Sequence, residues 1–187
     1  MPKDYSLEES PANAQRIAEY ARDDGWIREF LSRMQNGRIA TRWDDQPFIT
    51  PTTVWYDEER HEIIFHSGLV GRMRANIERH NRVCFEASES GRFLPSNTAL
   101  EFSVHYRSVI AFGTVRILED PDEKRRALYK LIEHCFPGMS PGEAYRPITD
   151  NELARTSVYV MAIESWSGKE NWKERASQSD EWPPLVD

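Results

Sequence analysis

"IIFHSGLVGRMRANIERHNRVCFEA", residues 63–87, is the stretch on which the fold prediction depends. A short apolar run ends in His66-Ser67, and a helical pattern begins at Gly71-Arg72. A strand end followed at once by a helix start brings free backbone N–H groups and a positive partial charge to one point. The Ser67 hydroxyl and the Arg72 guanidinium add donors that suit phosphate oxygens. The stretch predicts an anion site, and a solvated surface helix start stays open as the alternative.

The rest of the chain alternates short strand patterns with tight turns. Helices are expected at four places: after an Asp24 cap up to Gly37, over 71–80, from an Asp120 cap with Pro121 in the first turn, and over 148–155. Because most strands follow one another through short turns, antiparallel pairing is expected. The pattern predicts an α+β barrel or sheet. The expected strands are residues 37–43, 48–56, 62–67, 81–87, 99–118 and 156–166.

Glycine and proline mark special points in these strands. Pro51 removes one ladder N–H, which indicates an edge or a bulge. Gly113 is expected at a bulge in the longest strand. Residues 88–97, rich in Ser, Gly and Pro, are predicted to form a loop.

Composition excludes several classes of protein. The net charge of −7 argues against a general nucleic-acid binder. No apolar run approaches membrane-spanning length, so a cytoplasmic protein is expected. Cys84 and Cys135 have no zinc spacing, no metal site is expected, and Cys84 is predicted to be a buried free thiol.

Two further groups of residues are candidates for ligand contact. Arg107 lies among apolar positions of the longest predicted strand and is either solvent-facing or kept for a partner. Trp166 and Trp172 stand where the last predicted strand ends, and they either line a flat ligand or cap the barrel. Catalytic residues stay unknown, because no pattern activates a nucleophile. If the chain is an enzyme, a cofactor carries the chemistry.

Taken in order, these segments resemble the FMN-binding split barrels related to pyridoxamine 5'-phosphate oxidase, in particular the branch with nitroimidazole-resistance reductases. The resemblance runs from about residue 36 to 176 and is carried most specifically by residues 47–87 and 104–128. It implies a six-stranded antiparallel split β-barrel that forms a homodimer, with FMN in clefts between the subunits.

The resemblance also implies roles for individual residues. Thr50, Pro51, Thr52, Thr53, Val54 and Trp55 match the strand whose backbone follows the flavin ring. His66, Ser67, Arg72 and Met73 match the phosphate and ribityl site. Arg107, Ser108 and Val109 match the strand that enters the site from the partner subunit, and Trp166 matches a Trp that packs near the flavin.

Two departures from the family pattern stand out. The phosphate site usually reads Arg-Lys and here reads Arg72-Met73, so one cation is lost unless Arg74 substitutes. The substrate-gripping Arg-Leu-His of the oxidase proper is replaced by "ENWKER", residues 170–175, with Lys169 and Arg175 as the nearby basic residues. We therefore expect an FMN protein that is not a dedicated vitamin B6 oxidase.

The leading hypothesis is an FMN-dependent oxidoreductase that passes electrons from a reductant to a small organic acceptor. The alternatives are a flavin-binding or storage protein without turnover, and a split barrel that uses a deazaflavin or haem. One domain, 1–187, is expected, with an N-terminal arm over 1–22 and a C-terminal tail over 176–187.

Overall fold

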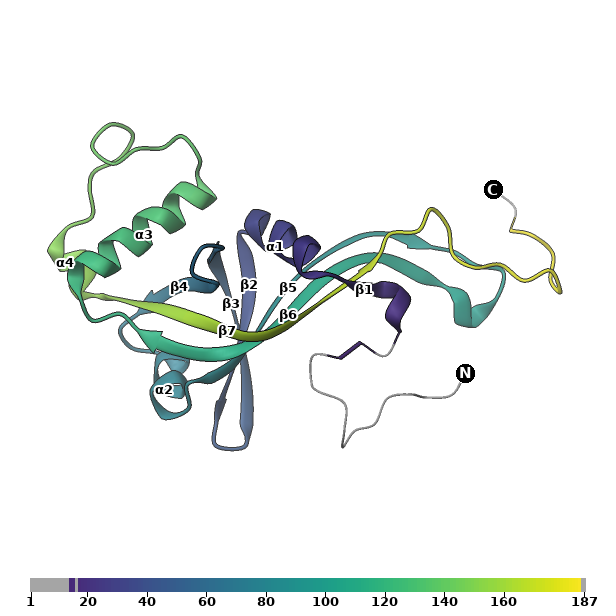
Figure 1. Cartoon of the computed structure of the whole chain (residues 1–187), viewed down its shortest axis with the longest axis horizontal. Coiled ribbons are helices and arrows are strands. Elements are labelled where there is room, and N and C mark those ends of the chain that lie inside the picture. The colour runs from purple at the N-terminus through teal and green to yellow at the C-terminus, as the bar shows by residue number, and fades with distance from the viewer. Residues whose placement is uncertain (1–13, 16, 186–187) are drawn as a thin grey trace.

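The computed structural model describes residues 14–15 and 17–185. Within them, one antiparallel sheet runs in the order β1-β7-β4-β3-β2-β5-β6, and a further pairing of β6 with β7 closes six strands into a ring. This is the predicted α+β split barrel, and the prediction is confirmed (Figure 1). The strands are β1 (Ala21–Arg22), β2 (Asn36–Trp43), β3 (Gln46–Asp57), β4 (Glu62–Gly68), β5 (Arg82–Leu94), β6 (Ser103–Ile117) and β7 (Thr156–Asn171). The helices are η1 (Ala18–Tyr20), α1 (Asp24–Arg33), α2 (Arg72–Arg79), η2 (Ala99–Glu101), α3 (Pro121–Cys135) and α4 (Asp150–Ala154).

The core fills the inside of this ring, because alternate side chains of each strand point inward. Burial along β5 and β6 alternates in this way, and Phe85 and Val109 are fully buried. Helix α1 adds Ile27, Phe30 and Leu31 to the same cluster. A second, smaller cluster lies outside the ring, where α3 packs on β4 and β7.

Gly113 allows β6 to close against β7. The register of the two strands shifts between Phe112 and Gly113, which confirms the predicted bulge. A Cβ at Gly113 would stand 2.0 Å from the carbonyl oxygen of Ala162. Only glycine permits this approach of the two backbones.

Several predicted boundaries are wrong. The N-cap of α1 is Asp23, which accepts from the Trp26 N–H at 2.9 Å, because the Asp24 carboxylate accepts from Trp166 instead. Helix α1 ends at Arg33, and Gly37 lies in β2, where the Phe85 ring occupies the space that a Cβ would need.

The predicted loop over 88–97 and the predicted end of the last strand are also wrong. Strand β5 continues to Leu94 because its backbone pairs with β6 again after an irregularity between Ser90 and Phe93. Strand β7 continues to Asn171 because its backbone also pairs with β6. Residues 99–101 form η2 rather than the start of β6. Trp166 therefore lies within a strand and not at its end.

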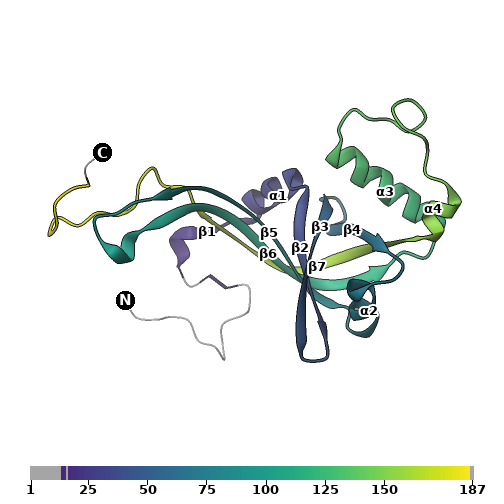
Figure 2. The same cartoon turned by 180° about the vertical axis from the view of Figure 1, so that it is seen from behind.

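The outer ends of β5 and β6 project from the barrel as a hairpin, residues 88–108, which we call the long hairpin (Figures 1 and 2). The C-terminal segment from Trp172 runs beside it, and Ser96 and Asn97 bond to the backbone of this segment. Helices α3 and α4 lie at the opposite end of the molecule. Of the predicted N-terminal arm, residues 1–13 and 16 lie outside the described part, and β1 pairs with β7.

Within the described residues, no helix is both long and apolar enough to cross a membrane. Cys84 and Cys135 form no disulfide, and Cys84 is half-buried rather than buried as predicted. Burial raises the pKa of both thiols.

Candidate functional site

The end of β4 and the start of α2 form one corner of the molecule. Ser67 Oγ lies 2.8 Å from the Tyr159 hydroxyl and donates to the Gly68 carbonyl at 2.8 Å. The buried Nδ1 of His66 has no hydrogen-bond partner among the described residues, and burial lowers the pKa of this imidazole. Gly71 has φ +157°, and apart from its chain neighbours no described atom lies within 4 Å of where its Cβ would stand. The helix start is therefore sterically open.

Arg72 is the exposed cation of this corner. Its guanidinium lies over the rings of Phe48, at 5.1 Å, and Trp43, at 5.6 Å. No carboxylate of the described part of the chain pairs with it. Arg74, the suggested substitute, bonds to Glu78 and Ser157 instead, and Met73 is buried in the core. Arg72 therefore holds the uncompensated charge here.

Strand β3 contributes an open edge next to this corner. Its residues 46–53 pair with β2, whereas its pairing with β4 begins only at Val54. Thr50, Pro51, Thr52 and Thr53 thus have a strand partner on one side, which confirms the edge predicted from Pro51.

The last two residues of the predicted β3 segment lie elsewhere. Val54 is 3 % exposed and belongs to the core inside the ring. The Trp55 side chain packs outside the ring against the cluster below α3. The side chains of Val54 and Trp55 therefore point away from the region beside the open edge of β3.

The structure separates Arg107, Ser108 and Val109 from this corner within one chain. Arg107 lies over Trp172 at 4.1 Å and donates to Glu170 at 2.9 Å and Glu89 at 3.0 Å, so its charge is compensated. Val109 is fully buried and its strand is paired on both sides. His66 pairs with residue 158 of β7 and Val109 with residue 168, which are separated by roughly 30 Å of strand.

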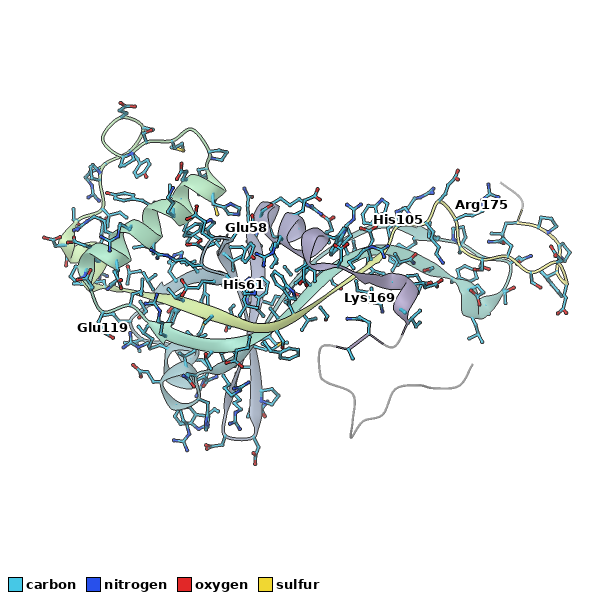
Figure 3. All side chains as sticks on the ribbon, viewed as in Figure 1. Glu58, His61, His105, Glu119, Lys169 and Arg175 are labelled. Atoms are coloured by element: carbon cyan, nitrogen blue, oxygen red, sulfur yellow. The ribbon has the colours of Figure 1, made fainter. Side chains whose placement is uncertain are left out.

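Trp166 belongs to a third place, at the end of the barrel that α1 covers. Its Nε1 donates to Asp24 at 2.8 Å, and its ring stands edge-on to His61 at 4.4 Å. His61 has φ +57° and bonds through Nδ1 to the Tyr56 hydroxyl at 3.1 Å, which also accepts from Arg28. Burial and the Arg28 charge lower the pKa of His61, which is labelled in Figure 3.

A cavity of about 650 Å³ lies away from the corner, between α3 and the outside of the barrel. Its lining includes the apolar residues Trp55, Ile64 and Val160 and charged residues such as Glu58, which is labelled in Figure 3. No sequence pattern pointed to this cavity, because its walls come from distant segments. The sequence interpretation also missed Trp43 and Phe48, whose contact with Arg72 depends on the β2–β3 hairpin folding against α2.

Comparison with known proteins identifies the family of the chain and supports its fold. The family model of pyridoxamine 5'-phosphate oxidase matches residues 23–170. The chain belongs to this family. The matched segment thus spans the barrel, from the N-cap of α1 to the end of β7. No curated protein sequence matches the chain.

Solved structures agree with the pyridoxamine 5'-phosphate oxidase fold. The flavocytochrome Anf3 from Azotobacter vinelandii is 23 % identical, with a TM-score of 0.79 over 90 % of this chain and 76 % of that one. A FAD and heme binding protein from Mycobacterium smegmatis is 22 % identical, with a TM-score of 0.75 over 85 % and 76 %. A protein assigned to 5-nitroimidazole antibiotic resistance from Bacteroides thetaiotaomicron is 20 % identical, with a TM-score of 0.67 over 80 % and 84 %. At these identities the likeness shows the fold.

Proposed function

We propose that this chain is a flavoprotein whose flavin phosphate binds at the corner between β4 and α2. The observation that carries the proposal is Arg72, an exposed guanidinium without a carboxylate partner in the described chain, at an open helix start. The unpartnered Nδ1 of His66 and the free edge of β3 beside it fit the polar tail and the ring of such a cofactor. Family membership and the flavin-binding neighbours named above support the same assignment.

In this proposal the chain's own residues hold and orient the cofactor. Arg72 donates a guanidinium fork to the phosphoryl oxygens, and the Ser67 hydroxyl and the N–H groups at the start of α2 add further donors. Thr50 to Thr53 present backbone along the ring. A bound flavin supplies hydride or single-electron transfer, and we propose that the acceptor is a small organic molecule. No side chain is proposed to form a covalent bond.

We also propose a homodimer with the flavin between two copies. The support is geometric: within one chain the strand with Arg107, Ser108 and Val109 lies roughly 30 Å along β7 from the corner. The two halves of the predicted site meet only if a second copy brings its own β6. A cytoplasmic location and a single domain over the whole chain stay predictions.

Titration of the flavin-free protein with FMN, followed by absorption, tests the site. Arg72→Ala is expected to weaken binding by about 1.5–3 kcal/mol, the range for a hydrogen bond to a charged group. Arg82→Ala is the matched control, since Arg82 is an exposed arginine that pairs with Glu164 on the surface. If the Arg72 variant and the unaltered protein bound FMN with equal affinity, Arg72 would not be part of the site.

Turnover is tested separately from binding. An oxidoreductase is expected to lose its oxidised-flavin absorption when a reduced nicotinamide is added without oxygen, and to regain it with a small organic acceptor. A flavin that stays oxidised with each reductant tried would favour the storage alternative.

A further inference from the structure

Helix α2 presents two arginines on the same face. Residues seven apart are two turns apart on a helix, so Arg72 and Arg79 point to the same side. Both guanidinium groups lie over the Trp43 ring, Arg72 at 5.6 Å and Arg79 at 4.8 Å from its centroid. Phe48, from the neighbouring strand, adds a second ring 5.1 Å from Arg72. The corner therefore continues from one cation into a group of two cations and two aromatic rings.

A buried hydrogen bond between α2 and β2 holds this group of two arginines and two rings in place. Asn76, between the two arginines on α2, donates to the Thr41 hydroxyl of β2 at 2.9 Å, and both side chains are buried. Thr41 pairs with Phe48 and lies two residues before Trp43, so all three share the face of the hairpin that packs on α2. The rings are thus part of the folded frame, while Trp43 keeps 38 % of its surface exposed.

The charges of this group are available to an anion. Arg72 has no carboxylate partner in the described chain. Arg79 pairs with Asp44 at 2.7 Å, but both side chains are about half exposed, and an ion pair of this kind contributes little. A phosphate that reached Arg79 would displace a weak surface contact.

We propose, resting on the flavin site proposed above, that this corner is built for a flavin dinucleotide. Arg72 and Arg79 bind the two phosphoryl groups of FAD, and the adenine lies against Trp43 and Phe48. Guanidinium groups suit the paired oxygens of a diphosphate, and aromatic rings bind any base through its π face. A mononucleotide would use Arg72 and leave Arg79 and Trp43 without a role in binding.

Parallel titrations of the flavin-free protein with FAD and FMN test the proposal. The unaltered chain is expected to bind FAD about tenfold or more tightly than FMN, as one stacked base alone contributes. Arg79→Gln is expected to reduce this preference and leave the FMN affinity within twofold, about the scatter of such a titration. Trp43→Ala is expected to weaken FAD binding more than FMN binding, because only FAD places a base against the ring. Trp43→Phe keeps a ring and is expected to keep most of the preference.

The controls are an exposed tryptophan of the C-terminal segment and the exposed arginine at the start of β5, which pairs with Glu164 and not with the group. Trp182→Ala and Arg82→Gln are expected to change neither affinity. Equal binding of FAD and FMN by the unaltered chain would overturn the inference and leave the flavin site intact. Trp43→Ala weakening both flavins equally would also overturn it, since the ring would then only brace α2. Failure to bind either flavin would refute the proposed function itself.

Discussion

Three arginines show how the environment assigns different roles to one residue type. Arg74 is bonded to Glu78 and Ser157, and Arg107 is held by Glu89 and Glu170. Arg72 has aromatic rings as its neighbours instead of carboxylates. A guanidinium already bonded to carboxylates has few donors left for a ligand, so Arg72 is the best anion-binding residue of the three.

Gly113 is the residue on which barrel closure most directly depends. Gly113→Ala would place a Cβ 2.0 Å from the Ala162 carbonyl oxygen, so β6 and β7 would have to separate. We expect a loss of about 3 kcal/mol in the free energy of unfolding, the upper end for overpacking. Chemical denaturation of the purified variant measures it.

Gly25→Ala is the matched control for this variant. Gly25 lies in α1, and the nearest atom to its added Cβ is 3.5 Å away, an ordinary contact. Alanine favours a helix over glycine, so this variant is expected to be as stable as the unaltered protein or more so. A Gly113→Ala protein of unchanged stability would contradict the closure that we describe.

Among the elements, the long hairpin is joined to the barrel by a cluster of charges at its base. Glu89 of β5 accepts from Arg33 of α1 at 2.9 and 2.8 Å and from Arg107 of β6 at 3.0 Å. The hydrogen bonds from Arg33, and then the one from Arg107, lower the pKa of this carboxyl to about 2. One carboxylate thus ties three elements together.

The stability of the fold is expected to depend on Glu89 in acid. Its folded pKa of about 2 is below the ordinary value of 4.5, so the ionised form stabilises the fold above about pH 4.5. This contribution decreases as the pH falls from about 4.5 towards 2. Glu89→Gln should lower the melting temperature at pH 7, and the difference from the unaltered protein should shrink over that interval.

Glu58→Gln is the control for the pH series. Glu58 lines the cavity below α3, and no ion pair joins it to another residue of the described chain. Its melting temperature should follow that of the unaltered protein at every pH. If the difference in melting temperature between Glu89→Gln and the unaltered protein were as large at pH 2 as at pH 7, the charge of Glu89 would not be the cause of the destabilisation.

At the scale of the whole molecule, the predicted site is divided. The corner with Arg72 lies at one end of β4, the Trp166 cluster lies near its other end, and Arg107 lies at the base of the long hairpin. Large apolar side chains are also exposed on the hairpin, including Phe93 and Leu100. Both features are accounted for if a second copy covers the hairpin and completes the site.

Light scattering of the flavin-loaded protein tests this assembly. The expected mass is twice the 21.8 kDa of the chain, because the site that we propose draws on two copies. Dilution should release flavin and dissociate the dimer together. A monomer that retains one flavin per chain would contradict the shared site.

The sequence alone was sufficient for features that depend on neighbouring residues. The Asp120-Pro121 start of α3 and the bulge at Gly113 follow from local backbone geometry. Pro51 indicated an edge or a bulge, and the structure has the edge. The short turns between consecutive strands then predicted antiparallel pairing and an α+β barrel or sheet, because antiparallel strands can be joined by a tight hairpin. The order of segments was enough to predict the family.

Tertiary structure decided what depends on partners distant in the chain. Residues 88–94 read as a loop because their composition is polar and flexible, but pairing with β6 makes them a strand. From the sequence, an unpaired Arg72 could not be distinguished from a neutralised Arg107, and the contact of Trp43 with two arginines could not be predicted. The ion pairs of these arginines and their contacts with aromatic rings involve side chains from separate strands and helices. The residues next to each arginine in the sequence therefore do not predict these contacts.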